Sequence, residues 1–558
     1  MASGANPPGA VSVPEGRTDR RRAGRSGEDG RLPGTSGPPG AEQDARPRDL
    51  GPSLLTLDGP RGTAAPQGDR YLEDLHLDEI IGRLTAGREA FDLGPFYREP
   101  LFDVETVVHR QDVFRDLERE ATLTAIKAFA ASMAQVRERE RRAERSDYRY
   151  ERERWHLDAS AAYVAAVDDL AEALRTPDVR SRGLAGYADY LATYLKADAF
   201  RGLAADIERL DDQLASVHYT LGIVGGRVVV ARYAGEPDDG RQVVATFARF
   251  SQGEGREFRF SVRATADMNH IEAALLDRVA LLFPDVFATL DRFQADHEAF
   301  VDPVVARLDR EAQFFLAYVG HMAPLRKRGL RFCYPEVSLD TTVEEVRETF
   351  DLALAAGLER DGKAAVVVND AELRAGERLI VVSGPNQGGK TTFGRTFGQL
   401  HHLARIGLPV PGSTARLRLA RSIFTHFERQ ERVEDLAGKL EEDLRRIRAI
   451  LDLVTADSVV VMNESFSSTT LDDQLFINTR VVRALLERGC LGLIVTFLDE
   501  LATLDPSIVS MVSTVDPAEP AKRTFRIVRR PADGLAYAMS IAEKHGLTHD
   551  RVAERIRR

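Results

Sequence analysis

The chain has 558 residues, of which 43% are hydrophobic and 29% charged, and a formal net charge of -11. This composition predicts a folded protein with several domains, and it restricts any nucleic-acid surface to a local basic patch on an acidic molecule. Only Cys333 and Cys490 occur, which excludes a disulfide framework and a cysteine-based zinc site. Because no apolar run approaches membrane-spanning length and no signal-peptide core is present, we expect a cytoplasmic protein without a membrane partner.

Residues 1–69 are rich in glycine, proline and arginine and carry almost no aromatic or β-branched side chains. Such a segment cannot bury enough apolar surface to offset the entropy lost on ordering, so we predict a disordered tail. Its arginine cluster at residues 17–22 is either a solvated charge cluster or a contact to DNA or another polyanion.

Residues 70–217 have the pattern of a helical core and lever domain. Apolar residues from Leu72 to Leu84 recur at helical spacing, and residues 121–216 read as long helices. The dense mixed-charge run at residues 137–145 can form pairs four residues apart and indicates a solvated helix face.

Residues 218–265 change period and predict a small β-rich insert. Strand-like runs occur at residues 219–224, 227–233 and 258–263, separated by glycine- and proline-containing turns. The arginines of this insert are candidates for phosphate contacts on DNA, or alternatively scattered surface charges; they are Arg227, Arg232, Arg241, Arg249, Arg256, Arg259 and Arg263. Helical patterns return over residues 266–328.

Residues 329–558 alternate strand and helix patterns, which predicts an α/β domain with a mostly parallel sheet and helices on both faces. An apolar run, Leu379–Ser383, precedes Gly384-x-x-x-x-Gly389-Lys390-Thr391, the phosphate-binding loop pattern. In this pattern the glycines aim backbone N–H groups at phosphates, the lysine reaches the outer phosphates, and the threonine hydroxyl holds Mg²⁺. We therefore predict an ATP and Mg²⁺ site whose cofactor-binding residues are Gly384, Pro385, Asn386, Gln387, Gly388, Gly389, Lys390, Thr391 and Thr392.

A second acidic motif follows a buried strand at residues 458–465. ATPases with this type of loop place an Asp-Glu pair there, in which the first residue holds Mg²⁺ through water and the second orients or deprotonates the attacking water. Glu464 is therefore predicted to be catalytic, together with Lys390. Asn463 is a candidate Mg²⁺ ligand beside Thr391, but its amide carries no charge, so we expect a weakened affinity for the metal.

The sequence of the loop is Gly-Pro-Asn-Gln-Gly-Gly-Lys-Thr-Thr. It resembles the loop of the MutS family, the ATPases of DNA mismatch repair, which commonly reads Gly-Pro-Asn-Met-Gly-Gly-Lys-Ser-Thr. Val368-Asn369-Asp370, Leu403–Pro411 and Ile423-Phe424-Thr425 are also similar to family segments, the last standing where the family has Ile-Phe-Thr-Arg. The resemblance implies an ABC-like P-loop ATPase domain behind the helical domain and its clamp-like insert. It also implies that Asn369 belongs to the nucleotide site and that two copies form composite ATP sites.

Several positions depart from the family pattern. The second acidic motif has Asn463 in place of aspartate, and the loop that begins at Ser465 lacks the glycines and arginine of the family's Ile-Gly-Arg-Gly-Thr. Phe497 stands where the family has a histidine that senses the γ-phosphate, and phenylalanine cannot donate a hydrogen bond. The family's serine-rich signature segment is replaced by residues 434–444, in which Lys439 could face the partner's ATP or be a structural lysine.

We interpret the chain as a MutS-like DNA-binding ATPase, an ATP-dependent clamp on duplex, mismatched or branched DNA that is related to mismatch repair. We find no Phe-x-Glu wedge motif in a suitable place, so direct mismatch reading is not expected. The expected partners are DNA, a second copy of the chain, and repair or signalling proteins, at a nucleoid-associated location in the cytoplasm. The alternative is a nucleotide-gated dimeric interaction protein with weak ATP hydrolysis and no mismatch recognition.

Overall fold

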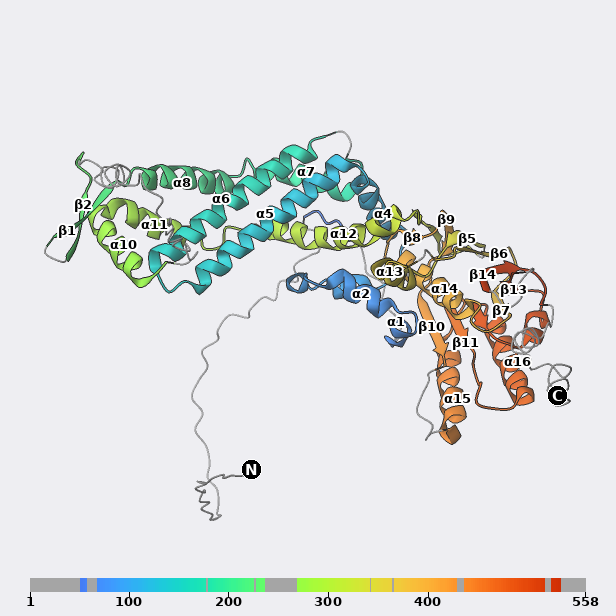
Figure 1. Cartoon of the computed structure of the whole chain (residues 1–558). Helices are drawn as coiled ribbons and strands as arrows, with labels where there is room; N and C mark the ends of the chain where they lie inside the picture. The colour runs from blue at the N-terminus through green and yellow to red at the C-terminus, as the bar shows by residue number, and fades with distance from the viewer. Residues whose placement is uncertain are drawn as a thin grey trace, which may run out of the picture. The chain divides into compact units, whose positions relative to one another are not determined.

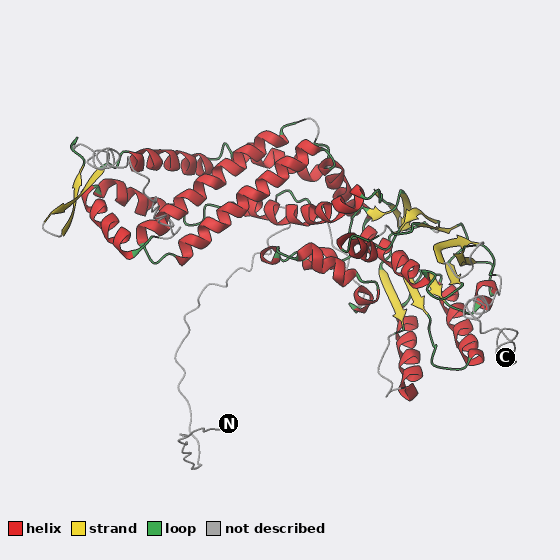
Figure 2. Cartoon of the chain, viewed as in Figure 1, coloured by secondary structure: helices red, strands yellow, loops and turns green. Residues whose placement is uncertain are grey.

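The computed structural model describes residues 51–57, 68–176, 179–224, 227–235, 268–341, 343–363, 366–428, 436–516 and 523–532. Up to residue 327 these residues form helices and one β-hairpin (Figures 1 and 2). The elements are α1 (Arg70–Asp74), α2 (Leu77–Thr85), η2 (Glu89–Phe91), α3 (Gly94–Arg98), α4 (Val104–Leu117), α5 (Glu120–Arg145), α6 (Arg149–Leu174), α7 (Arg182–Tyr194), α8 (Asp198–Ala215), β1 (Tyr219–Val224), β2 (Arg227–Arg232), α10 (His270–Leu282), α11 (Pro284–Asp296) and α12 (Pro303–Lys327).

The long helices α5 and α6 lie side by side because each has an apolar stripe at helical spacing (Figure 1). On α5 the stripe runs from Ile126 to Val136, and its residues are at most 8% exposed. The predicted charge run forms the far end of α5, where Glu138 pairs with arginines one turn away. Arg137 is an exception to the solvated face, because it pairs with the buried Asp309 and thereby ties α5 to α12.

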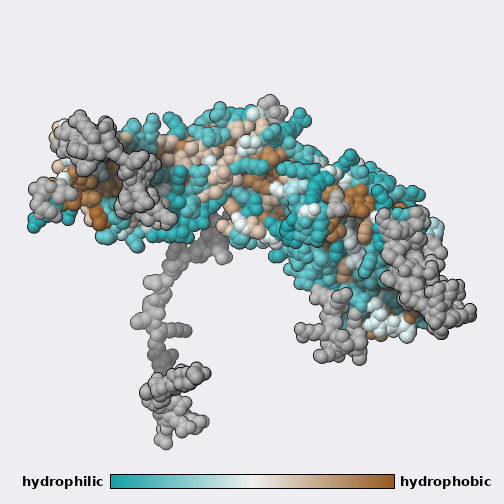
Figure 3. Space-filling view, viewed as in Figure 1, coloured by the Kyte–Doolittle hydropathy of each residue, from teal (hydrophilic) through white to brown (hydrophobic). Residues whose placement is uncertain are grey.

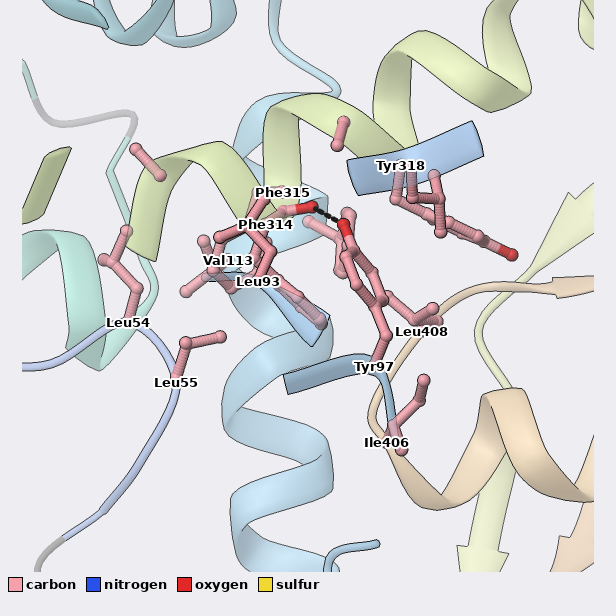
Figure 4. Packing of buried hydrophobic residues seen from close by; sticks show 14 of the residues in the cluster. Leu54, Leu55, Leu93, Tyr97, Val113, Phe314, Phe315, Tyr318, Ile406 and Leu408 are labelled. Atoms are coloured by element: carbon pink, nitrogen blue, oxygen red, sulfur yellow. Dashed lines mark hydrogen bonds between the residues drawn. The ribbon is translucent and has the colours of Figure 1, made fainter. Parts of the chain in front are cut away.

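Residues 51–57 correct our prediction of a disordered tail up to residue 69. Leu54 and Leu55 are each 1% exposed and lie in the core beside α4 and α12 (Figure 4). The Glu311 carboxylate accepts hydrogen bonds from the Ser53 hydroxyl at 2.7 Å and from the Leu54 N–H at 2.6 Å. A pair of adjacent leucines and a buried acceptor therefore order this segment although the tail as a whole is polar. We call residues 51–57 the strap.

One hydrophobic core joins the helices to the C-terminal part of the chain (Figure 4). Tyr97 stacks on Phe314 and donates a hydrogen bond to its carbonyl at 2.7 Å. Ile406 and Leu408, which follow helix α14 (Lys390–Arg405), pack into the same cluster, and Tyr318 donates to the Pro409 carbonyl at 2.7 Å. The helical region and the region that follows it are therefore continuous in their packing.

The hairpin β1–β2 occupies part of the predicted β-rich insert. The strands are antiparallel, with Tyr219 opposite Arg232, and α10 packs against β2. Arg232 is held within the protein, since its guanidinium donates to the Leu282 carbonyl and lies 4.7 Å from the ring centroid of Phe283. Arg227 is exposed, and brown apolar side chains gather near the hairpin and α10 in Figure 3. Arg241, Arg249, Arg256, Arg259, Arg263 and the predicted strand at residues 258–263 lie outside the described residues.

From residue 332 onward strands and helices alternate (Figure 2). Besides α14, the elements are β3 (Phe332–Cys333), β4 (Glu336–Ser338), β5 (Glu344–Thr349), α13 (Leu352–Arg360), β6 (Asn369–Leu373), β7 (Leu379–Ser383), β8 (Val410–Pro411), β9 (Thr414–Arg418), β10 (Ser422–Phe427), α15 (Leu436–Leu453), β11 (Ser458–Asn463), α16 (Leu471–Arg488), β12 (Leu491–Val495), η4 (Asp499–Thr503), β13 (Ile508–Val515) and β14 (Arg523–Arg529).

The main sheet has the order β10-β11-β12-β7-β13-β14, and all its pairings are parallel except that of β14. Alternate residues of β7 enter two different cores. Ile380 and Val382 pack in the cluster that contains α14, whereas Leu379 and Val381 pack with residues of α15 and α16. The fully buried parallel strands explain the continuous apolar runs in the sequence.

A smaller sheet, β4-β9-β5-β6, and a short β3–β8 pair flank the main sheet. Of the helices that the structure describes, none combines the length and the apolar character needed to cross a bilayer.

We predict that the strap depends on Glu311. Glu311→Ala leaves the Leu54 N–H and the Ser53 hydroxyl without an acceptor in the core, and each buried unsatisfied group costs about 1–3 kcal/mol. We expect a lower midpoint of urea unfolding and faster proteolytic cleavage within residues 51–57 of the full chain. Glu298→Ala, which removes an exposed carboxylate, is the control. Cleavage at an unchanged rate in Glu311→Ala contradicts the assignment.

Candidate functional site

The loop between β7 and α14 has a backbone that requires glycine. Gly384 and Gly389 have φ angles of +114° and +89°, in the region that disfavours side chains. A Cβ on Gly388 would lie 2.2 Å from the Ser513 hydroxyl oxygen, and that hydroxyl donates to the Gly388 carbonyl at 2.8 Å. The neighbouring strand β13 therefore fixes the loop at the N-terminal end of α14.

Lys390 is the first residue of α14, and its side chain folds back over the loop. Its Nζ donates to the carbonyls of Gly384 and Pro385 at 3.0 and 3.1 Å and lies 4.2 Å from the ring centroid of Phe497. Burial lowers the pKa of Lys390 to about 8, and the nearby Glu464 carboxylate offsets part of this effect. The amine is thus held by groups that a stronger anionic partner could replace.

Asn463 and Glu464 lie where β11 ends, between β10 and β12. Glu464 has a φ of 50°, unusual for a residue with a side chain, and its N–H donates to the Val495 carbonyl at 2.9 Å. Burial raises the pKa of Glu464, although Lys390 acts in the opposite direction. Asn463 is 7% exposed, and its Oδ1 is buried without a hydrogen-bond partner among the described residues.

Lys390 and Glu464 open into one pocket of about 520 Å³. Of the predicted site residues, its walls include Asn369, Gln387, Gly388, Gly389, Lys390, Thr391, Thr392 and Glu464. Gly384, Pro385, Asn386 and Asn463 are not part of its walls. Gly384 and Pro385 instead hold Lys390, and the Asn386 carbonyl accepts from Arg523 at 3.1 Å. The structure therefore brings the glycine loop and the second acidic motif together. Asn463 lies next to this pocket as the residue that precedes Glu464.

Sequence reasoning missed the apolar side of this pocket. The residues that line it are Phe350, Leu354, Val367 and Phe525, which come from three separate segments of the chain with no common motif. Asn369 acts through the backbone of β14: its amide donates to the Phe525 carbonyl at 3.1 Å and accepts from the Ile527 N–H at 2.7 Å. Asn369 thus positions Phe525 at the mouth of the loop.

Sequence reasoning also missed a buried polar cluster behind Glu464. His426, at the end of β10, lies 3.2 Å from the Ser465 hydroxyl through Nδ1 and 3.2 Å from an Asp443 carboxylate oxygen through Nε2. A single histidine in an apolar strand gives no sequence signal for such a cluster. In the neighbouring segment, Glu434 and Asp435 and the side chain of Lys439 lie outside the described residues.

Phe497 follows β12 and is 48% exposed, with its ring against Lys390. It occupies the position where the resemblance expects a histidine, and here it contributes a π face in place of an N–H donor.

Comparison with known proteins supports the arrangement. Residues 380–555 match the family model MutS domain V. The chain is 30% identical over 197 residues to the Endonuclease MutS2 of Thermomicrobium roseum, a region covering 35% of this chain and 24% of that protein. It is 29% identical over 224 residues to the DNA mismatch repair protein MutS of Ruminiclostridium cellulolyticum, a region covering 39% of this chain and 25% of that protein. The aligned part thus spans about a quarter of the length of each relative. The chain therefore contains a C-terminal region that matches MutS domain V, and its glycine loop faces Glu464.

Proposed function

We propose that the chain is a MutS-type ATPase that couples hydrolysis of Mg²⁺-ATP to its grip on DNA. The observation that carries this proposal is the convergence of Lys390, Thr391 and Glu464 on one pocket at the end of the parallel sheet. An amine, a hydroxyl and a carboxylate are the side chains required for phosphate binding, Mg²⁺ binding and water activation.

Two features, one at the glycine loop and one at the end of β11, fit ATP and Mg²⁺. The glycine loop meets the N-terminus of the 16-residue helix α14, where backbone N–H groups and the helix dipole favour phosphate. The buried, unpartnered Oδ1 of Asn463 fits an acceptor for metal-bound water. Thr391 and Asn463 would hold Mg²⁺. When bound, ATP and Mg²⁺ supply the terminal phosphoryl group and the charge that stabilises its transfer to water.

The residues of the chain have separate tasks in this scheme. Lys390 exchanges the carbonyls of Gly384 and Pro385 for phosphate oxygens and brings a positive charge to them. Glu464 orients the attacking water and accepts its proton, a task that a carboxylate with a raised pKa performs more readily near neutral pH. The apolar walls, including Phe350 and Phe525, exclude water and accommodate the nucleotide base.

Binding to duplex, mismatched or branched DNA is supported by two observations. Relatives that share the C-terminal domain carry the names of an endonuclease and of a DNA mismatch repair protein. The hairpin β1–β2 also presents Arg227 to solvent beside α10. We further propose that two copies close around composite ATP sites and that closure transmits the nucleotide state to the helical region, in a cytoplasmic, nucleoid-associated protein that also contacts repair or signalling proteins.

The second candidate function is a nucleotide-gated dimeric interaction protein that hydrolyses ATP weakly and does not recognise mismatches. Phe497 and Asn463 favour it. The first places a ring where a donor to the terminal phosphate is expected, and the second removes a charge from the metal site.

The proposal predicts ATP turnover that depends on Lys390 and responds to DNA. Steady-state hydrolysis by the full chain, with and without duplex, mismatched and branched DNA, is expected to change with DNA. Lys390→Ala should abolish both ATP binding and turnover, whereas Glu464→Gln should bind ATP but lose turnover. Binding without turnover in the wild-type protein, indifferent to every DNA, would favour the interaction protein.

A negative charge at residue 463 should strengthen the binding of Mg²⁺. We expect Asn463→Asp to lower the Mg²⁺ concentration for half-maximal turnover about tenfold, because Coulomb attraction of a few kcal/mol outweighs the cost of burying a carboxylate. The control is Asn269→Asp, which adds the same charge at the N-cap of α10, where aspartate also caps well, and should leave the Mg²⁺ requirement unchanged. An unchanged Mg²⁺ requirement in Asn463→Asp removes Asn463 from the metal site.

Phe497 provides a test of the missing sensor. Phe497→His supplies an N–H donor beside Lys390, and we expect turnover at saturating ATP to rise several-fold. Phe497→Leu removes the ring without adding a donor and is the matched control. If histidine brings no gain over leucine, slow turnover is not caused by the absence of a donor at residue 497.

A further inference from the structure

His426 connects two elements that the catalytic scheme leaves separate. Its ring is fully buried, with Nδ1 at 3.2 Å from the Ser465 hydroxyl on the loop after β11. On its other side, Nε2 lies 3.2 Å from a carboxylate oxygen of Asp443 on α15. The neutral tautomer that suits both partners carries the proton on Nε2, so that Nδ1 accepts from the serine.

Ser465 directly follows Glu464, so contacts that hold Ser465 also hold the backbone from which the Glu464 carboxylate extends. The Ser465 carbonyl accepts from the Gln474 amide at 3.1 Å and from the Asn478 amide at 3.4 Å, both on α16. Its hydroxyl is tied to His426 of β10. These bonds hold the chain next to Glu464, whose φ of 50° costs free energy and persists only if neighbouring contacts enforce it.

The other end of the cluster reaches the outer helix α15, which packs on the edge strand β10. Arg446, one turn after Asp443, donates to the Asp74 carboxylate at 2.6 Å and to the Thr425 carbonyl at 2.9 Å. Helix α15 is thus fastened to α1 as well as to β10. Among the described residues the Nε2 of His426 has no aligned hydrogen bond, although Asp443 is close, so a small displacement of α15 can make or break this contact.

The serine, histidine and aspartate do not form a hydrolase site. Ser465 is 5% exposed and His426 is fully buried beside the Phe466 ring, so no substrate can reach the hydroxyl. A buried hydrogen-bonded cluster of this kind serves to fix geometry.

We propose that His426 is a positioning residue that fixes Glu464 through Ser465 and couples its position to helix α15. The inference rests on the proposed ATPase activity and adds a route by which movement of α15, or of α1 through Asp74 and Arg446, changes the rate of hydrolysis without changing ATP affinity.

Two amide substitutions of His426 separate its contacts. Asparagine places an amide near the position of Nδ1 and can keep the contact to Ser465, whereas glutamine reaches the position of Nε2 and keeps only the contact to Asp443. We expect His426→Gln to lower kcat about tenfold, the effect of one lost hydrogen bond in the transition state. His426→Asn should stay within about twofold of wild type, and both should bind a fluorescent ATP analogue as wild type does.

Ser465→Ala is the second test, because it removes one hydroxyl and leaves the packing intact. It should lower kcat as much as His426→Gln, and the double variant should be no slower than either single variant. Thermal unfolding of each variant checks that the fold is retained. Equal kcat in His426→Gln, Ser465→Ala and wild type overturns the inference alone. A wild-type protein that binds ATP without any Lys390-dependent turnover overturns the proposed function and the inference with it.

Discussion

The guanidinium of Arg110 is a buried charge at the point where the strap, the helical region and the C-terminal region meet. It is 4% exposed, and it donates from Nε to the Leu55 carbonyl of the strap at 2.9 Å and from Nη1 to the Ile406 carbonyl after α14 at 2.8 Å. A buried guanidinium is stable only when acceptors surround it. Loss of either carbonyl would leave part of its charge in an apolar core without a hydrogen bond. The strap, the helical core and the end of the loop helix therefore all meet at one side chain.

The loop helix α14 is braced along its length by polar contacts as well as apolar ones. Gln399 donates to the Leu75 carbonyl at 2.9 Å and accepts from the Leu352 N–H at 2.9 Å. The fully buried Arg405 donates to the Tyr71 hydroxyl at 2.7 Å. A Cβ on Gly398 would lie 2.6 Å from the Leu75 side chain, so the packing against the segment after α1 is close. A movement of the glycine loop that passes into α14 must therefore also move the N-terminal helices. A nucleotide-driven clamp requires this kind of coupling.

The sequence predicted those parts of the structure whose cause is local. The spacing of Gly384, Gly389 and Lys390 encodes one loop geometry, and the apolar runs that flank it encode buried parallel strands. The strap escaped because composition averages over 69 residues, while its order depends on Leu54 meeting Glu311, which is distant in the chain. Arg232 was expected to be either a phosphate contact or a surface charge, and its position over the Phe283 ring depends on a tertiary contact.

The missed residues of the site have the same origin. Phe350 reaches the pocket from the residue after β5, and Phe525 reaches it from β14. His426, Ser465 and Asp443 likewise come from three separate segments of the chain. Pattern reasoning recognises spacing within a segment, and none of these pairs has a fixed spacing.

The departures from the family pattern at this site act in opposite directions. In the proposed ATPase, Asn463 lacks a charge next to Glu464 and Phe497 lacks a donor next to Lys390, and both would weaken chemistry at the terminal phosphate. Residues 426 and 465, where the family segments quoted above have arginine and isoleucine, here form a buried hydrogen bond behind the catalytic carboxylate. A site that loses direct contacts to the nucleotide but gains a tie from its carboxylate to α15 has its rate set more by the position of that helix. In the proposed ATPase, these four residues together favour a hydrolysis rate that is controlled by conformation over a fast intrinsic turnover.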